Sequence, residues 1–419
     1  TTVIGYGSPN KADSHDVHGA ALGGDEVEAT RKYLGWEHAP FEVPSDVLDH
    51  FRKAVDAGAT LEADWNKTFE SYKSKYPEDG AQFEKLVLKQ ELPAGYEEAL
   101  KEAAAAAGDT PTRGLSQTML NALAPVVPNL VGGSADLAPS NLTIMKGYGD
   151  FLKESYEGRN LRFGVREHGM GAICNGIGLD QTGLIPYCAT FFIFTDYMRA
   201  AMRLAALSQV GVIYVMTHDS VALGEDGPTH QPIEHLASYR AMPNIYMARP
   251  ADATEVAAYY AVGLESRKTP TILALTRQKT PKLANGSFDG AKKGAYVLED
   301  SSADGADADV LLVASGSEVG TILEAAEILK GKGKTVRVVS MPCWERFEEQ
   351  TEEYRDSVFP PSVPKSKRVV CEAGSSFGWN RYADNFVTID RFGISAPGGA
   401  AMKFFGITPE NVAEVAGAL

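Results

Sequence analysis

The stretch LRFGVREHGMGAICNGIGLDQTGLIPYCATFF, residues 161–192, decides the fold. Its first residues, LRFGVRE, predict a short strand, and HGMGAICNGIGL predicts a helix rich in small residues. LIPYCATFF then predicts a second, more apolar strand. A strand, a helix and a strand in this order are typical of a parallel sheet in an α/β protein.

The same alternation continues on both sides of this stretch. A helix at 114–127 precedes the apolar strand NLVGG, and GVIYVMTHD at 211–219 predicts a buried strand. The polar stretch KLANGSFDGAKKG at 282–294 is interpreted as a hinge, and a second strand–helix unit begins near residue 300. We therefore predict an α/β fold with two consecutive parallel-sheet domains.

The first hundred residues have a different character. TTVIGYGS at 1–8 predicts a strand that runs into a glycine turn, as if the chain began inside a sheet and were cut from something longer. Residues 46–107 predict helices that form a linker, because aromatic residues recur there at i, i+4, i+7 and i+11. These residues are Trp65, Phe69, Tyr72 and Tyr76.

Composition excludes several classes of protein. The 419 residues carry a net charge of −15, which argues against nucleic acid as the main partner. Apolar runs such as GVIYVM are too short to cross a membrane. The 4 cysteines include no CxxC pair, so a disulfide framework is not expected and a reducing compartment is favoured.

Polar residues follow the predicted strands, at the edge of a parallel sheet where ligands bind. His218 and Asp219 follow GVIYVMT, and the loop GEDGPTHQP comes next. Other loops of this kind begin at Arg166 after LRFGV, at Ser134 after LVGG and at Arg277 after ILALT.

Each of these features also has a purely structural interpretation. His218, Asp226 and His230 either stabilise their loop by hydrogen bonds within it or, less readily, bind a metal ion. Glu167 is interpreted by default as an ion-pair partner for Arg166. Its position where a strand enters a helix rich in Gly and Ala favours a functional role instead. The aromatic residues of FFIFTDY are core residues when taken alone, and the turn ASGSE at 314–318 is interpreted as structural.

Taken together, the motifs resemble the transketolase family. They are GSADLAPSN, GVREHGM, FFIFTDY, THDSVALGEDGPTHQP and LTRQ, in this order. The resemblance extends from HDVHGAALGGDE at 15–26 to SMPCWERF at 340–347, and ICNG, LIPYCATFF and LASYRAMPNI resemble the plastid enzymes of plants and algae.

The resemblance implies a division of the chain. Residues 1–76 match the tail of a diphosphate-binding domain and a helical linker, 77–287 a pyrimidine-binding domain, and 288–419 a C-terminal domain. The family motif GDG…N for metal and diphosphate has no counterpart in this sequence. The ligands of Mg²⁺ or Ca²⁺ are therefore expected outside it, the chain alone is expected to be inactive, and residues 1–20 are expected to be mobile.

Transketolases transfer a two-carbon ketol unit from a ketose phosphate to an aldose phosphate with thiamine diphosphate. By resemblance, Glu167 binds the aminopyrimidine ring nitrogen and promotes the imino tautomer that removes the thiazolium proton. The aromatic pocket around the pyrimidine matches Phe191, Phe194 and Tyr197, and the positions beside the thiazolium ring match Asp136 and Leu137.

The resemblance also assigns residues to the substrate. His15 matches a histidine near the diphosphate and the first hydroxyl of the sugar, His218 and His230 match further catalytic histidines on the substrate side, and Asp226 matches an acceptor for a sugar hydroxyl. The clamp on the sugar phosphate matches Arg113, Ser140 and Arg277. A guanidinium fork suits a phosphate.

The implied partners are sugar phosphates of the Calvin cycle and the pentose phosphate pathway: xylulose 5-phosphate, ribose 5-phosphate, erythrose 4-phosphate and fructose 6-phosphate. A homodimer in the chloroplast stroma is expected, with the cytoplasm as the alternative. Two competing interpretations are the β-subunit of an α-keto-acid dehydrogenase and a folded scaffold with half a site. The C-terminal domain shows no catalytic cluster and is interpreted as structural.

Overall fold

The computed structural model describes residues 2–302 and 307–419. The chain divides into two compact units, residues 1–81 and 82–419. Among the described residues, no helix is long and apolar enough to cross a membrane.

The helices predicted over residues 46–107 are confirmed. They are α2 (Ser45–Lys75), α3 (Pro77–Phe83), the π-helix η2 (Glu84–Leu88) and α4 (Tyr96–Ala106). A further helix, α1 (Gly24–Leu34), was not predicted from the sequence. The aromatic residues of α2 pair along its length, with the rings of Trp65 and Phe69 stacked at 5.2 Å between centroids. This contact is the one expected of side chains four residues apart on a helix.

The strand predicted at 1–8 is wrong from residue 2 onward, where the structure describes the chain. Gly5 and Gly7 adopt positive φ angles of 67° and 94°, and the Ser8 amide donates to the Gly5 carbonyl at 3.0 Å. The segment is a turn fastened to α1, where Glu26 accepts hydrogen bonds from the Ser8 hydroxyl and the Asn10 amide. A strand needs a sheet neighbour, and the described residues of this unit contain no other strand. The mobility expected of this segment stays a prediction.

The second unit contains a six-stranded parallel sheet in the order β3-β2-β4-β5-β7-β6. Its strands are β2 (Leu130–Ser134), β3 (Asn160–Arg162), β4 (Ile185–Phe191), β5 (Ile213–Thr217), β6 (Tyr246–Ala248) and β7 (Thr271–Leu275). All residues of β4, β5 and β7 are buried, as expected of a parallel sheet covered on both faces.

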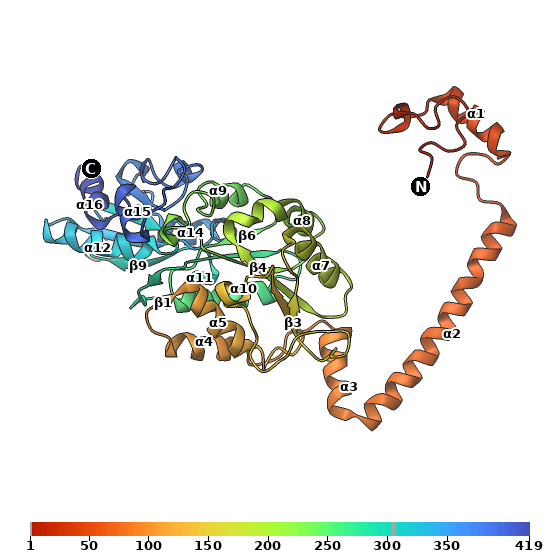
Figure 1. Cartoon of the computed structure of the whole chain (residues 1–419), viewed down its shortest axis with the longest axis horizontal. Helices are drawn as coiled ribbons and strands as arrows, with labels where there is room; N and C mark the ends of the chain where they lie inside the picture. Colours follow the sequence, from red (N-terminus) through yellow and green to blue (C-terminus); the bar gives the residue numbers. More distant parts are fainter. Residues whose placement is uncertain (1, 303–306) are drawn as a thin grey trace. The chain divides into compact units, whose positions relative to one another are not determined.

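Helices cover both faces of this sheet (Figure 1). On one face α4, α5 (Thr112–Leu123) and α10 (Ala253–Glu265) pack on alternate strand residues such as Tyr187 and Val215. On the other face α7 (Glu167–Leu179) and α8 (Thr195–Leu207) pack on the residues between them, such as Cys188 and Tyr214. The alternation follows from the two-residue repeat of a strand.

A five-stranded sheet follows, in the order β13-β12-β10-β11-β9. Its strands are β9 (Tyr296–Asp300), β10 (Val310–Ala314), β11 (Val336–Ser340), β12 (Arg368–Cys371) and β13 (Asn385–Val387). The strands are parallel except for β9, which pairs antiparallel with β11 at the edge. The two predicted parallel-sheet domains are therefore present, with one antiparallel edge strand of a kind common in α/β sheets.

The two sheets share a continuous hydrophobic core. It runs from Leu115 on α5 through Tyr260 on α10 to Ile322 on α12 (Glu318–Gly331). The stretch 282–294, interpreted from sequence as a hinge, contains the helix α11 (Phe288–Lys292). Ala291 of α11 is fully buried and its carbonyl accepts a hydrogen bond from the Tyr259 hydroxyl at 2.8 Å. The stretch is thus packed against α10 and is not an open linker.

A carboxyl group is buried between the sheets. Glu255 on α10 is fully buried, and its Oε1 accepts hydrogen bonds from the Tyr296 hydroxyl of β9 at 3.0 Å and the Ser340 hydroxyl of β11 at 2.5 Å. Burial, reinforced by the negative charge of Asp252, raises the pKa of Glu255 from 4.5 to about 7. The folded chain therefore binds this proton more tightly than the unfolded chain does.

This shift predicts how stability depends on pH. A raised pKa contributes stability that is complete below pH 4.5 and is lost as the pH rises through 7. The Glu255→Gln variant, which cannot ionise, should lose less stability than the parent chain between pH 5 and pH 8. The difference should approach about 3 kcal/mol, at 1.36 kcal/mol for each unit of pKa shift.

Urea unfolding at the two pH values measures this difference, with Glu324→Gln on the exposed face of α12 as the matched control. An identical pH dependence of unfolding in the parent chain and in Glu255→Gln would contradict the prediction.

Candidate functional site

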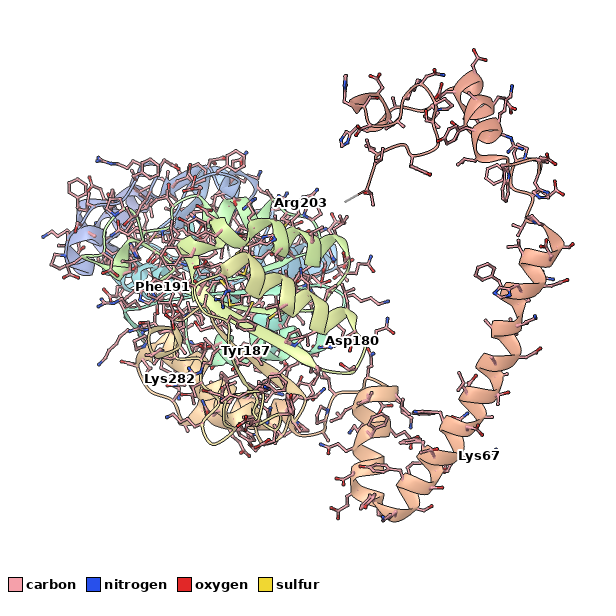
Figure 2. All side chains as sticks on the ribbon, turned by 45° about the vertical axis from the view of Figure 1, so that its right-hand side comes forward. Lys67, Asp180, Tyr187, Phe191, Arg203 and Lys282 are labelled. Atoms are coloured by element: carbon pink, nitrogen blue, oxygen red, sulfur yellow. The ribbon has the colours of Figure 1, made fainter. Side chains whose placement is uncertain are left out.

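Polar and aromatic residues gather at the carboxyl ends of β2, β4, β5 and β7. Phe191 ends β4, whose buried middle carries Tyr187 (Figure 2). His218 follows β5 and Arg277 follows β7 by two residues. The rings of Phe191 and His218 lie 3.8 Å apart between centroids, so neighbouring strands do bring these residues together.

Two residues at this edge have a strained backbone. Asp136 after β2 and His218 after β5 have φ angles of 61° and 62°, in the left-handed region that side chains disfavour. Such conformations cost free energy and persist where the surrounding structure enforces them, which is common at functional sites. The strain is consistent with the sequence expectation that both residues belong to the site.

A pocket of about 440 Å³ opens beside these strand ends. Its lining combines the loop after β2 with the starts of α7 and α8: Ala135, Asp136, Leu137, Val165, Glu167, Phe194 and Tyr197. Glu167 is the first residue of α7 and is only 9% exposed, whereas Tyr197 at the rim is 68% exposed. The pocket therefore offers one sheltered carboxyl group among apolar and aromatic side chains.

A chain of rings connects this pocket to the histidines. Phe194 lies 6.2 Å from Tyr197 and 5.9 Å from Phe191, measured between ring centroids. Its ring also meets that of His230 edge-on at 5.4 Å. Phe191, Phe194 and Tyr197, expected from sequence to act together, are thus contiguous and reach both predicted histidines of this unit.

Hydrogen bonds fix the tautomer of His218. The Thr217 hydroxyl donates to Asn141 Oδ1 at 2.7 Å, and the Asn141 amide donates to Ser134 Oγ at 2.8 Å. The hydroxyl oxygen of Thr217 also lies 2.9 Å from Nδ1 of His218. Because Thr217 has already donated its only hydroxyl proton to Asn141, Nδ1 of His218 must donate to the Thr217 oxygen. Nε2 of His218 therefore keeps a free lone pair.

The surroundings also fix the charge of His218. The residue is 3% exposed, and burial together with the positive charges of Arg113 and Arg277 lowers its pKa from 6.5 to about 3. His218 is therefore neutral at any physiological pH. A neutral imidazole with a free Nε2 can accept a proton or a hydrogen bond.

The two arginines carry unneutralised charge. Arg113 Nη1 donates to the Ser140 carbonyl at 2.7 Å, and Arg277 Nη1 donates to the Leu223 carbonyl at 3.0 Å. Within the described residues, neither guanidinium forms an ion pair with a carboxylate, and burial together with Arg277 lowers the pKa of Arg113. Two adjacent cations held by neutral carbonyls provide a place for an anion.

The loop at 224–232 is held by the second sheet domain. Gln231 is 1% exposed, and its Nε2 donates to the carbonyls of Gly224 at 3.0 Å and Ile394 at 2.9 Å. The Ser395 hydroxyl donates to the Glu225 carbonyl at 2.6 Å. Asp226 remains exposed on this anchored loop, where its carboxylate is free to meet a ligand.

His15 belongs to the other compact unit, residues 1–81, where its imidazole is exposed and lies 3.5 Å from the Asp16 carboxylate. The turn at 314–318 is structural, as interpreted from sequence, because Ser315 and Glu318 are fully buried. Asn141, Thr217 and Gln231 were missed as individual residues, although each lies inside or beside a quoted motif.

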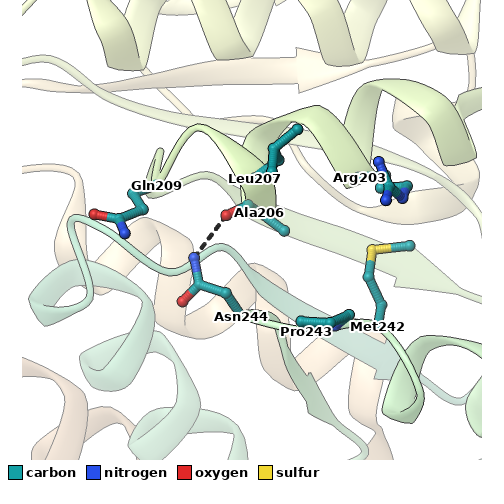
Figure 3. A pocket seen from close by; sticks show the side chains of 7 residues that line it. All are labelled: Arg203, Ala206, Leu207, Gln209, Met242, Pro243 and Asn244. Atoms are coloured by element: carbon teal, nitrogen blue, oxygen red, sulfur yellow. Dashed lines mark hydrogen bonds between the residues drawn. The ribbon is translucent and has the colours of Figure 1, made fainter.

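A further pocket, of about 240 Å³, lies at the opposite edge of the sheet (Figure 3). It is lined by residues that precede β5 and β6: Arg203, Ala206, Leu207, Gln209, Met242, Pro243 and Asn244. Within its lining, Asn244 Nδ2 donates to the Ala206 carbonyl at 2.7 Å. Since ligands of parallel sheets bind at the carboxyl ends of strands, the pocket that contains Glu167 is the better candidate.

Three family profiles match consecutive parts of the chain. They are described as "Transketolase, thiamine diphosphate binding domain" for residues 1–93, "Transketolase, pyrimidine binding domain" for 109–282, and "Transketolase-like TK C-terminal domain" for 294–408. The edge that carries the pocket and the histidines belongs to the second of these matches.

Curated relatives and solved structures agree with the profiles. The chain is 57% identical to chloroplastic transketolase-1 of Arabidopsis thaliana over 99% of its length, and it spans 56% of that protein. It is 56% identical to a chloroplastic transketolase of Craterostigma plantagineum, of which it spans 80%. The solved transketolase of Pichia stipitis in complex with sedoheptulose 7-phosphate is 42% identical, with a TM-score of 0.93 over 100% of this chain and 61% of that one. The pocket edge, the profiles and these relatives together show that the chain belongs to the transketolase family.

Proposed function

We propose that this chain is the pyrimidine-binding and C-terminal part of a transketolase, which transfers a two-carbon ketol unit between sugar phosphates. The observation that carries the proposal is the meeting of three features at one sheet edge. These are the sheltered carboxyl of Glu167, the rings from Phe191 to Tyr197, and the arginine pair beside His218.

The pocket fits the aminopyrimidine half of thiamine diphosphate. Its aromatic walls suit a flat ring, and the Glu167 carboxyl, only 9% exposed, is placed to form a hydrogen bond with a ring nitrogen. Asp136 and Leu137 line the same pocket and are assigned to the neighbouring thiazolium side. When bound, the cofactor supplies the carbanion chemistry of ketol transfer, while Glu167 holds the proton at the pyrimidine nitrogen.

The metal ion, Mg²⁺ or Ca²⁺, and the contacts to the diphosphate other than that of His15 are assigned to residues that this sequence does not contain. The metal-binding motif of the family has no counterpart here, and the relatives are longer than this chain. Absence of turnover by residues 1–419 alone stays a prediction. Measuring turnover in the protein at its full natural length, beside this chain, tests both statements.

The arginine pair fits the phosphate of the sugar substrate. Arg113, tied to Ser140, and Arg277 offer fork-shaped donors without a competing carboxylate among the described residues. Solved relatives from Pichia stipitis are complexes with xylulose 5-phosphate, sedoheptulose 7-phosphate and fructose 6-phosphate. We assign the same class of substrate to this chain, together with the ribose and erythrose phosphates.

The remaining polar residues face the sugar chain in this proposal. The neutral Nε2 of His218 accepts a proton or a hydroxyl hydrogen bond, His230 stands beside it across the Phe191 ring, and Asp226 accepts a hydrogen bond from a hydroxyl group. His15 is assigned to the diphosphate end and the first hydroxyl by family resemblance alone.

We also propose the boundaries 1–76, 77–287 and 288–419 for the three parts. The three profile matches support a division into three parts, although the first match extends to residue 93. A plastid stromal location is supported by the chloroplastic names of the relatives from Arabidopsis thaliana and Solanum tuberosum.

A homodimer through α7 and α8 is supported by their exposed apolar side chains, including Ile173, Leu204 and Leu207 at 49%, 52% and 67% exposure. Sedimentation of the full-length protein at micromolar concentration should show a dimer, because exposed apolar side chains that lie together on two adjacent helices are typical of an interface between subunits. A monomer alone would contradict the proposed interface.

Replacing Glu167 tests the cofactor assignment. In the full-length protein, Glu167→Ala should reduce kcat by about 10²- to 10⁴-fold, the range typical of a lost acid–base group. The binding of sugar phosphate should change little, because Glu167 lies on the aromatic side of the site. Steady-state kinetics measure both, with Glu154→Ala at an exposed position as control. Unchanged kcat would contradict the assignment.

Replacing Arg277 tests the phosphate assignment. Arg277→Ala should raise the KM of phosphorylated ketoses by about 10- to 100-fold, since a charged hydrogen bond is worth about 1.5–3 kcal/mol. Unphosphorylated ketoses should be affected little. Lys279→Ala, which removes an exposed cation two residues away, is the matched control. Equal losses for both kinds of substrate would show that Arg277 does not bind the phosphate.

A further inference from the structure

Three potential metal ligands converge where α8 meets α9 (His235–Arg240), outside the residues assigned above. Nε2 of His235 lies 3.1 Å from Asp196 Oδ1, and Nδ1 of His235 lies 3.9 Å from Glu234 Oε2. One ligand atom from each of the three residues lies within 4.8 Å of the others. An ion binds only one nitrogen of an imidazole, and metal bonds of about 2.0–2.2 Å place neighbouring ligands about 3 Å apart. Nε2 and Asp196 Oδ1 are therefore already at ligand spacing, whereas the exposed Glu234 side chain has to turn to reach the same ion.

His235 is an unusual histidine. It is 2% exposed, and although Nε2 lies 3.1 Å from the Asp196 carboxylate, neither ring nitrogen forms a hydrogen bond of good geometry with the described residues. Buried polar atoms without a partner are rare in folded proteins, because they lose the hydrogen bonds that water would give them. The ring is held edge-on against Phe192 at 5.5 Å between centroids, so its direction toward the carboxylates is fixed by packing.

The charges around the cluster favour a divalent cation. Asp196 in the first turn of α8 and Glu234, the N-cap of α9, supply two negative charges and keep 61% and 62% of their side-chain surface open to solvent. Among the described residues, neither carboxylate forms an ion pair with a lysine or an arginine. Arg199, one turn along α8 from Asp196, instead contacts the Ser238 hydroxyl at 2.5 Å and the Tyr239 ring at 4.9 Å.

We propose that Asp196, Glu234 and His235 bind a first-row divalent metal ion, represented by Zn²⁺, with water completing the coordination. One imidazole and two carboxylates suit Zn²⁺ better than Mg²⁺, which prefers oxygen ligands only. This site is separate from the diphosphate metal, and it does not depend on the function proposed above.

The position of the ion relates it to the pocket. Asp196 lies between Phe194 and Tyr197, which line the pocket, and Glu234 follows the anchored loop that carries His230. A bound ion therefore fastens the start of α8 to the end of that loop. Binding of Zn²⁺ should raise the midpoint of thermal unfolding, because a ligand that binds only the folded state stabilises it.

Equilibrium dialysis of the 419-residue chain against Zn²⁺, without thiamine diphosphate and with excess Mg²⁺, tests the proposal. The parent chain should bind one Zn²⁺ that Mg²⁺ does not displace. His235→Phe should weaken binding by at least about 100-fold, more than the 10- to 100-fold usual for a lost outer partner of a ligand. His50→Phe, at an exposed histidine of α2, is the matched control and should bind as the parent does.

Two further measurements keep the test decisive. Co²⁺ in the parent chain should give visible absorption of a four- or five-coordinate ion, and Asp196→Asn should change that spectrum while circular dichroism shows a folded chain. Absence of Zn²⁺ binding by the parent chain would overturn the proposal. Equal binding by the parent chain and His235→Phe would also overturn it.

Discussion

The site edge depends on one fully buried guanidinium. Arg249, just after β6, donates to the Asp219 carboxylate at 2.8 Å, to the Ser315 carbonyl at 2.9 Å and to Glu318 at the start of α12. Asp219 is the residue after His218, whereas Ser315, just after β10, and Glu318 belong to the second sheet domain. Removing one partner of a buried ion pair destabilises the folded protein by about 3–5 kcal/mol, so the loss of either carboxylate would leave Arg249 uncompensated and disturb its other contacts as well.

The same network extends through a second pair and gives the C-terminal domain a physical role. Glu372 after β12 is fully buried and accepts hydrogen bonds from Arg240 at 2.7 and 2.8 Å and from Trp379 Nε1 at 2.7 Å. The positive charges of Arg240 and Arg249 hold the pKa of Glu372 at about 2 despite its burial. The second sheet domain carries none of the assigned site residues, yet it fastens the helix α9 and the residues that follow β5. It therefore positions the edge at which we place the chemistry.

Much of this arrangement follows from short-range patterns in the sequence. The alternation of strands and helices predicted both sheets, and the place of Glu167 between a strand and a helix indicated its special position. The strand at 1–8 was predicted wrongly because an apolar run followed by glycine is equally compatible with a turn when no neighbouring strand is present. Asn141 and Arg249 were missed because their partners are 76 and 30 residues away, and only the fold brings such pairs together.

A structure of the full-length protein with thiamine diphosphate, its metal ion and a ketose phosphate tests the central claim most directly. The claim is that one edge of the six-stranded sheet holds both the pyrimidine and the sugar phosphate. The account predicts the pyrimidine ring against Glu167 and Phe194, and the sugar phosphate between Arg113 and Arg277. A sugar phosphate bound away from both arginines, or a pyrimidine ring outside the Glu167 pocket, would contradict it.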